Sequence, residues 1–157
     1  MKKITAFIFI AVLLLVSCKG STKYSVTTED FPDNRWNTGE AKELEFSIDK
    51  DQEADVYILF GYKYGTQFTD VPVKLEITAP DGSITLLTSE LKLTDEAGKS
   101  LGDCAGDVCD LAVLAKKGLK LQKGDYTFKV INNFTKASYL PNVLSVGIKL
   151  EHMLGKE

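Results

Sequence analysis

The chain has 157 residues, with 19 basic and 22 acidic side chains and a formal net charge of −3. This length suits one domain that buries a real core. The basic residues are scattered and Arg35 is the only arginine. A chain without guanidinium clusters lacks the usual readers of phosphate and base edges, so the composition argues against nucleic acid as a partner.

The first segment is typical of an export signal. Met1-Lys2-Lys3 precedes an uncharged, apolar run from Ile4 to Val16. A membrane-spanning helix needs roughly 20 apolar residues, whereas the core of a secretory signal has about 7–15. The alternative is a short buried core helix, but the run is apolar on all sides and starts with the chain. The pattern therefore predicts a signal helix within residues 1–17.

The apolar run ends in Leu15-Val16-Ser17-Cys18, which resembles the bacterial lipobox, L-x-[small]-C. The resemblance implies a diacylglyceryl thioether on Cys18, cleavage before this residue and acylation of the new amino terminus. Several acyl chains give stable anchoring where one gives only marginal binding. Lys19 stands where an aspartate is associated with inner-membrane retention, which favours the outer membrane, on its periplasmic or cell-surface face. Covalent lipid is the only cofactor expected.

Residues 18–30 are polar and have no sustained period, so we expect a lipidated tether that holds a folded domain, residues 31–157, clear of the headgroups. Beyond the tether, apolar residues alternate with polar ones, as in half-buried strands. Pro72 should lie near the start of its strand or at a sheet edge, because it lacks an amide donor. The alternating runs cover residues 44–48, 56–62, 71–79, 126–130 and 144–150.

Pro80-Asp81-Gly82 is a turn by composition and predicts a hairpin between the run that ends at Ala79 and residues 83–88. Residues 94–107 contain three glycines and are expected to form a loop. Residues 111–117 are short and alanine-rich, and a helical turn and a short strand both remain open there. Short strands separated by regular turns predict an all-β domain, an antiparallel β-sandwich or jelly roll.

Cys104 and Cys109 remain as a pair once Cys18 is lipidated. In an oxidising compartment an even pair favours a disulfide. Free thiols or a metal site are the alternatives, but C-x4-C without histidine partners is neither zinc spacing nor the C-x-x-C redox motif. The three carboxylates within residues 103–110 could bind calcium, although they lack the ligand order of an EF-hand. A disulfide-pinned acidic turn is preferred, and no metal site is predicted.

No residue is predicted to be catalytic. His152 is the single histidine, lies close to the end of the chain and is expected to be a solvated tail residue. Triads of the Ser-His-Asp or Cys-His kind would need this side chain. Carboxylates are plentiful, but their spacing favours no pair for glycoside hydrolysis.

Aromatic residues offer the best candidate surface for a ligand or partner. Tyr62, Tyr64 and Phe68 cluster around one predicted strand and its exit loop, and Trp36 precedes the first clear strand. Alternation places Tyr62 with the core residues, and Trp36 could dock the incoming segment with its indole N–H on a partner. Core packing and a glycan-binding platform are therefore both open.

Four stretches in order resemble the gliding motility lipoprotein GldH family of the Bacteroidota. They are FPDNRW followed by ELEFSI, LEITAPDGS, GKSLGDCAGD, and GLKLQKGDYTFKV with the closing LPNVLSVGIKLE. The resemblance implies a non-enzymatic outer-membrane lipoprotein that takes part in an envelope protein assembly, the gliding motility or type IX secretion-associated machinery. The alternative is a surface or periplasmic carbohydrate-binding lipoprotein module.

Overall fold

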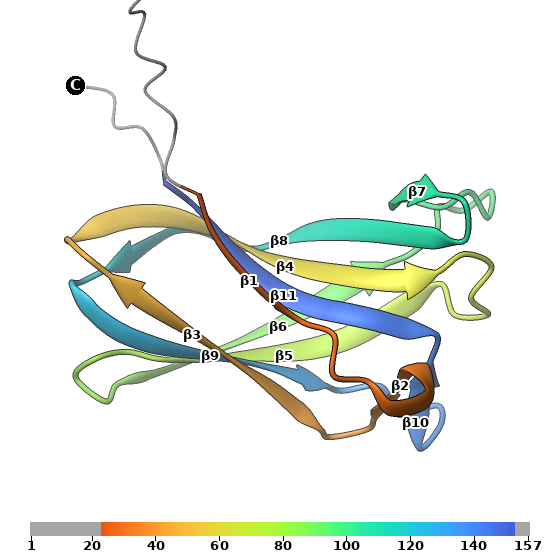
Figure 1. Ribbon diagram of the computed structural model, residues 1–157, viewed down its shortest axis with the longest axis horizontal. Helices are drawn as coiled ribbons and strands as arrows, with labels where there is room; N and C mark the ends of the chain where they lie inside the picture. The colour runs from red at the N-terminus through yellow and green to blue at the C-terminus, as the bar shows by residue number, and fades with distance from the viewer. Residues whose placement is uncertain (1–22, 153–157) are drawn as a thin grey trace, which may run out of the picture.

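The computed structural model describes residues 23–152, and these fold into two antiparallel sheets that face each other (Figure 1). The predicted signal peptide, Cys18 and the beginning of the expected tether lie outside the described residues. The five-stranded sheet has the order β1 (Lys23–Thr28), β11 (Val143–His152), β4 (Gln52–Lys63), β8 (Val108–Leu121) and β7 (Asp103–Ala105). The four-stranded sheet has the order β3 (Ala41–Ile48), β9 (Gly124–Asn132), β5 (Asp70–Thr78) and β6 (Ile84–Lys92).

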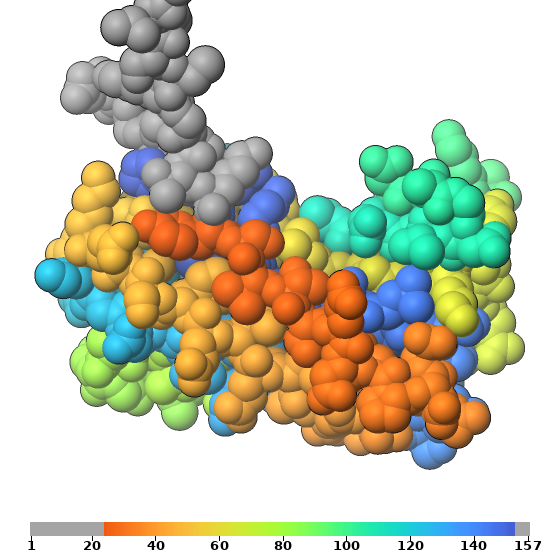
Figure 2. Space-filling view, in the orientation of Figure 1, coloured from red at the N-terminus to blue at the C-terminus, as the bar shows by residue number. Residues whose placement is uncertain are grey.

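A short third sheet closes one end of the sandwich. It pairs β10 (Tyr139–Pro141) with β2 (Arg35–Asn37), which follows the 3-10 turn η1 (Pro32–Asn34). The predicted antiparallel β-sandwich is therefore confirmed. Figure 2 shows the side of the molecule where the red and orange segments β1 and β3, which contact each other, lie over the seam between the two sheets.

The core lies between the sheets because the strands alternate as the sequence predicts. In β3, Leu44, Phe46 and Ile48 are buried while the residues between them are exposed. Residues at every second position of a strand share one face, so this face can bury its apolar side chains against the other sheet. Burying a large apolar side chain contributes about 1.5–3 kcal/mol. Phe60 and Phe128 are among the largest fully buried side chains.

The expected tether is wrong over Lys23–Thr28, which form the edge strand β1. This strand pairs with β11 from Lys23↔Glu151 to Thr28↔Val146. Tyr24 and Val26 pack against the core, whereas Ser25 and Thr27 are exposed. The alternation is present in the sequence but is carried by two apolar residues among serine and threonine. Residues 19–22 alone separate Cys18 from β1, a span of at most about 18 Å.

The turn predictions hold. At Pro80-Asp81-Gly82, the Gly82 N–H donates to Ala79 O (2.9 Å) and the Ala79 N–H donates to Ser83 O (2.9 Å). Gly82 has φ +82°, a conformation that glycine adopts without steric cost. Pro72 is the third residue of β5, where pairing with β9 ends, and its carbonyl accepts the Asn133 N–H (3.1 Å).

The structure decides the conformation of residues 111–117, which the sequence left open, and adds a short strand to the predicted loop over residues 94–107. Residues 111–117 belong to the strand β8, whose pairing with β4 overrides the helical preference of an alanine-rich stretch. The predicted loop over residues 94–107 contains the three-residue strand β7. Its antiparallel pairing with β8 brings Cys104 opposite Cys109.

Candidate functional site

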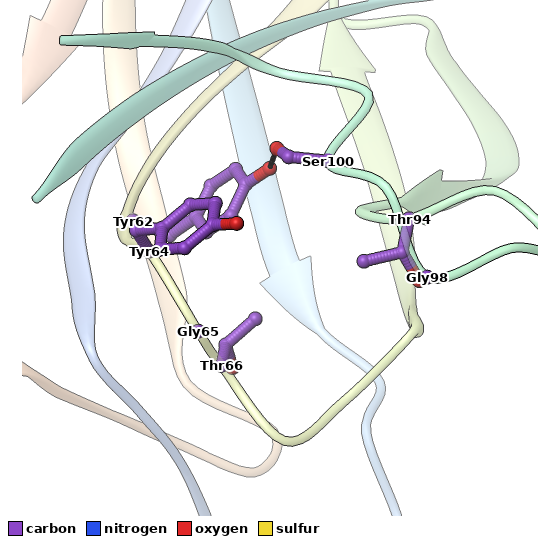
Figure 3. Close-up of a pocket in the computed structure, with 7 residues that line it drawn as sticks. All are labelled: Tyr62, Tyr64, Gly65, Thr66, Thr94, Gly98 and Ser100. Carbon is purple, nitrogen blue, oxygen red and sulfur yellow. Dashed lines mark hydrogen bonds between the residues drawn. The ribbon is translucent and has the colours of Figure 1, made fainter. Parts of the chain in front are cut away.

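A small pocket of about 120 Å³ opens at the end of the sandwich away from the β5–β6 turn (Figure 3). The end of β4 and the turn after it contribute one wall, and the loop between β6 and β7 contributes the other. The pocket therefore joins two segments that are about 30 residues apart in the sequence. It is lined by Tyr62, Tyr64, Gly65, Thr66, Thr94, Gly98 and Ser100.

Tyr62 forms the inner part of this pocket but is 3% exposed, as the core alternative predicts. Its hydroxyl donates to Leu93 O (3.3 Å) and shares a hydrogen bond with Ser100 Oγ (2.9 Å). A Cβ at Gly102 would lie 2.8 Å from this hydroxyl oxygen, so glycine allows the loop its close approach. Tyr62 therefore attaches the loop to the sandwich.

The predicted disulfide between Cys104 and Cys109 is present and reinforces the same loop. Cys109 is buried opposite Tyr62 in the β4–β8 register, while Cys104 is exposed on β7. Ser100 Oγ lies 3.3 Å from Cys104 Sγ. The tyrosine hydroxyl, the serine and the disulfide thus form one connected unit beneath the pocket.

Tyr64 is the accessible aromatic residue of the pocket. Its side chain is 62% exposed, and its N–H donates to Asp107 O (2.9 Å). Thr94 Oγ1, on the opposite wall, is buried and has no hydrogen-bond partner among the described residues. An unpaired buried hydroxyl costs about 1–3 kcal/mol. The pocket therefore presents the exposed ring of Tyr64 to solvent, whereas the Thr94 hydroxyl is closed to it.

The four-residue aromatic surface expected from the sequence is not assembled. Trp36 is fully buried, and its indole N–H donates to Glu40 O (3.1 Å). It docks η1 and β2 onto the sandwich, as the alternative predicts. Phe68 is partly buried against Phe134, with ring centroids 4.5 Å apart in an edge-to-face geometry. Of the predicted set, Trp36 and Tyr62 are therefore closed to a ligand and Tyr64 is open.

A buried polar cluster below Trp36 was not predicted. Lys42 is 7% exposed, pairs with Glu40 Oε1 (2.7 Å) and donates to the carbonyl of Asp30. Burial raises the pKa of the Glu40 carboxyl, but the hydrogen bond and charge of Lys42, with bonds from Asn37, outweigh it and hold the pKa below its usual value. Lys42 lies two residues before Leu44 in β3 and therefore on the same, inward face of the strand. The alternation in the sequence could have identified it as buried.

Asn132 belongs to the same cluster and is 1% exposed. Its Nδ2 donates to Trp36 O (2.8 Å) and Asn37 O (3.2 Å), and its Oδ1 accepts the Phe134 N–H (2.9 Å). These bonds attach β2 and the segment after β9 to each other. The cluster stabilises the end of the sandwich next to the pocket rather than forming a binding site.

Within residues 23–152, no three His, Cys, Asp or Glu side chains are grouped as a metal site requires, the carboxylates of residues 103–110 included. The expectation of a solvated His152 is wrong, because the residue ends β11, is half-buried and has a buried Nδ1. No helix in the described part of the chain has the length and apolar character to cross a membrane.

Several solved structures match the chain at low similarity. The Eiger TNF of S. frugiperda is 16% identical, with 72% of this chain and 66% of that chain covered and a TM-score of 0.39. A protein of Sulfurospirillum deleyianum is 12% identical, with 87% of this chain and 100% of that chain covered and a TM-score of 0.41. A family 35 carbohydrate-binding module of Clostridium thermocellum is 14% identical, with 82% of this chain and 90% of that chain covered and a TM-score of 0.38. This level of similarity carries no information on ligand or partner.

No curated protein matches the chain. The family model described as GldH lipoprotein matches residues 23–150, from the start of β1 to Leu150 in β11. Its match includes β1, which the tether prediction had left outside the domain. A lipoprotein of this family is a membrane-anchored protein of the cell envelope. The chain belongs to the GldH lipoprotein family.

Proposed function

We propose that this chain is a non-enzymatic, lipid-anchored component of the gliding motility or type IX secretion-associated machinery at the outer membrane. The observation that carries the proposal is the GldH lipoprotein match over residues 23–150. The lipobox that ends in Cys18 supports it, because acyl chains on this residue would hold the domain at the membrane. With residues 19–22 as the connection, the domain would stay within about 18 Å of its anchor.

The proposal is tested by cross-linking and affinity purification of the tagged chain from membranes of the source organism. Anchored chain should recover proteins of the gliding or secretion machinery. The Cys18→Ala variant cannot carry the lipid, so it should be missing from the outer-membrane fraction and lose these partners, which separates specific recovery from background. Recovery of no envelope protein above the Cys18→Ala background would refute the assembly role.

A glycan-binding module is the second candidate, and the pocket at Tyr64 favours it. The exposed ring of Tyr64 offers a surface for stacking against a sugar ring. We expect a glycan array probed with the soluble domain to show retention that Tyr64→Ala abolishes. Tyr57→Ala is the matched control, because Tyr57 is half-buried on the outer face of β4, outside the pocket. Retention that is equal in both variants, or absent from the parent domain, would contradict glycan binding there.

A further inference from the structure

The strand β6 leaves an apolar edge of the four-stranded sheet open. It lies at the end of the sheet order, at the rear in Figure 1, and pairs with β5 on one side. Leu86 is 69% exposed and Ile84 is 60% exposed, values among the highest for large apolar side chains in the described chain. Exposed apolar edges are a liability that soluble β-proteins usually avoid.

The β6 edge has few of the devices that block strand addition, and its charged residues Glu90 and Lys92 lie at the end of the strand away from Leu86. Its register with β5 runs without a shift from Asp70↔Lys92 to Thr78↔Ile84, and the strand contains no proline. The strand β8, which β7 covers only from Val108 to Asp110, is different: its pairing with β4 is shifted near Lys116, and Gly118 has φ +61°. Bulges interrupt the pairing of such edges, whereas β6 keeps one register with β5 over nine residues.

The backbone groups of β6 that face outward follow from the hydrogen bonds at its two ends. Ala79 and Ser83 bond across the hairpin (2.9 Å), and the Leu93 N–H donates to Thr69 O (2.7 Å). Bonded and non-bonded pairs alternate along an antiparallel ladder. The residues of β6 whose N–H and C=O groups point away from β5 are therefore Ile84, Leu86, Thr88, Glu90 and Lys92. The two exposed apolar side chains thus lie on residues with free backbone groups.

We propose that two copies of this chain pair antiparallel through β6, joining their four-stranded sheets into one continuous sheet. A two-fold axis at Leu86 places this residue opposite its counterpart and Ile84 opposite Thr88 of the second copy. The leucines and isoleucines of both copies then form one apolar cluster, a favourable set of cross-strand contacts. Glu90 and Lys92 of each copy come beside the turn of the other copy, beyond the overlap of the two strands, so no charged residue of β6 faces an apolar one.

This register is preferred to its alternatives. An axis at Thr85 would overlap only residues 84–86 of the two strands, and an axis at Leu87 would place Ile84 opposite Glu90. An axis at Thr88 would also use the free backbone groups, but it would place Leu86 opposite Glu90 and Ile84 opposite Lys92. Apolar side chains would then face charged ones, and the apolar surface would remain partly exposed. Isologous pairing of this kind closes on itself, so it forms a dimer and leaves no β6 edge open for further growth.

The geometry also suits two chains anchored in one membrane. The two-fold axis of an antiparallel edge pair is perpendicular to the sheet, so both five-stranded sheets lie on the same side of the dimer. The beginning of β1 in each copy, at Lys23, is therefore on that side as well. Lipidation of Cys18 would bring both copies to one surface and raise their effective concentration. The dimer goes beyond the proposed function and does not depend on its protein partners.

The test is disulfide cross-linking of the full chain in membranes, with two differently tagged copies carrying Leu86→Cys. Oxidation should give a dimer that contains both tags. Thr88→Cys should not cross-link to itself, because its two sulfurs would lie about 13 Å apart along the strands. A mixture of Ile84→Cys and Thr88→Cys copies should cross-link to each other. The parent chain, which keeps Cys104 and Cys109 bonded, is the background control.

A second measurement uses the mass of the purified lipidated chain in detergent. Leu86→Lys should convert the dimer to a monomer, and Leu114→Lys, at a residue that is 45% exposed on the other sheet, should not. Three results would overturn the proposal: no Leu86→Cys dimer, equal cross-linking of Leu86→Cys and Thr88→Cys, or capture of a different protein by Leu86→Cys. An unchanged mass of Leu86→Lys relative to the parent chain would do so as well.

Discussion

Replacing Asn132 with leucine tests whether the buried polar cluster holds the end of the sandwich together. Leucine resembles asparagine in shape but removes three hydrogen bonds, two donated to Trp36 O and Asn37 O and one accepted from the Phe134 N–H. Each such bond contributes about 0.5–1.5 kcal/mol, and the bonds of a residue that is 1% exposed cannot be replaced by water. We therefore expect Asn132→Leu to lower the free energy of unfolding by about 3 kcal/mol.

The assay is urea unfolding of the soluble domain, followed by tryptophan fluorescence, because Trp36 lies directly on the cluster. With a slope of about 2 kcal/mol/M, this loss lowers the midpoint by about 1.5 M urea with an unchanged slope. Asn133→Ala is the matched control at the next, half-buried residue and should cost less than about 1 kcal/mol. A loss below about 1 kcal/mol in Asn132→Leu would refute the assignment of Asn132 as the central residue of the cluster.

Three further variants test the loop and the cluster. Replacing both Cys104 and Cys109 with alanine opens a short loop and should lower the free energy of unfolding by about 2 kcal/mol in the absence of reductant, with no change from added reductant afterwards. Tyr62→Phe removes the bonds to the loop and should cost about 1 kcal/mol by urea unfolding, with faster amide exchange at residues 93–102; unchanged exchange would contradict the attachment. The lowered pKa of Glu40 contributes stability above its usual value of 4.5, and this stability is lost as the pH falls through the folded-state pKa. Lys42→Met should therefore flatten the decline in stability between pH 6 and pH 3, and an identical decline in both proteins would exclude the pair as its source.

The sequence and the structure agree where the signal is local. Leu44, Phe46 and Ile48 recur at every second residue, and burial against the opposite sheet follows from this period alone. The Pro80-Asp81-Gly82 turn needs a residue with positive φ at Gly82, which the residue types already specify. Cys104 and Cys109 are five residues apart around a turn, so their pairing also depends on few neighbours.

Residues 23–28, which the sequence pattern assigned to the tether, show the limit of local patterns. Tyr24 and Val26 alternate with serine and threonine, a weak period that a solvated tether could also have. What makes this segment a strand is β11, more than a hundred residues later in the chain, which offers an edge for pairing. The alanine-rich stretch within β8 was ambiguous for the same reason, since its strand conformation depends on β4.

The sequence by itself predicts the export signal and the lipobox, and it determined the strand-rich fold and the disulfide, because each is encoded in residue types over a few neighbouring positions. The tertiary structure alone decided which polar and aromatic groups are buried. Tyr62 meets Ser100 from another loop, Asn132 reaches Trp36, and Leu86 stays at a sheet edge because of the strand order. Burial and edge exposure depend on which strands become neighbours, and that pairing is set by contacts between distant parts of the chain.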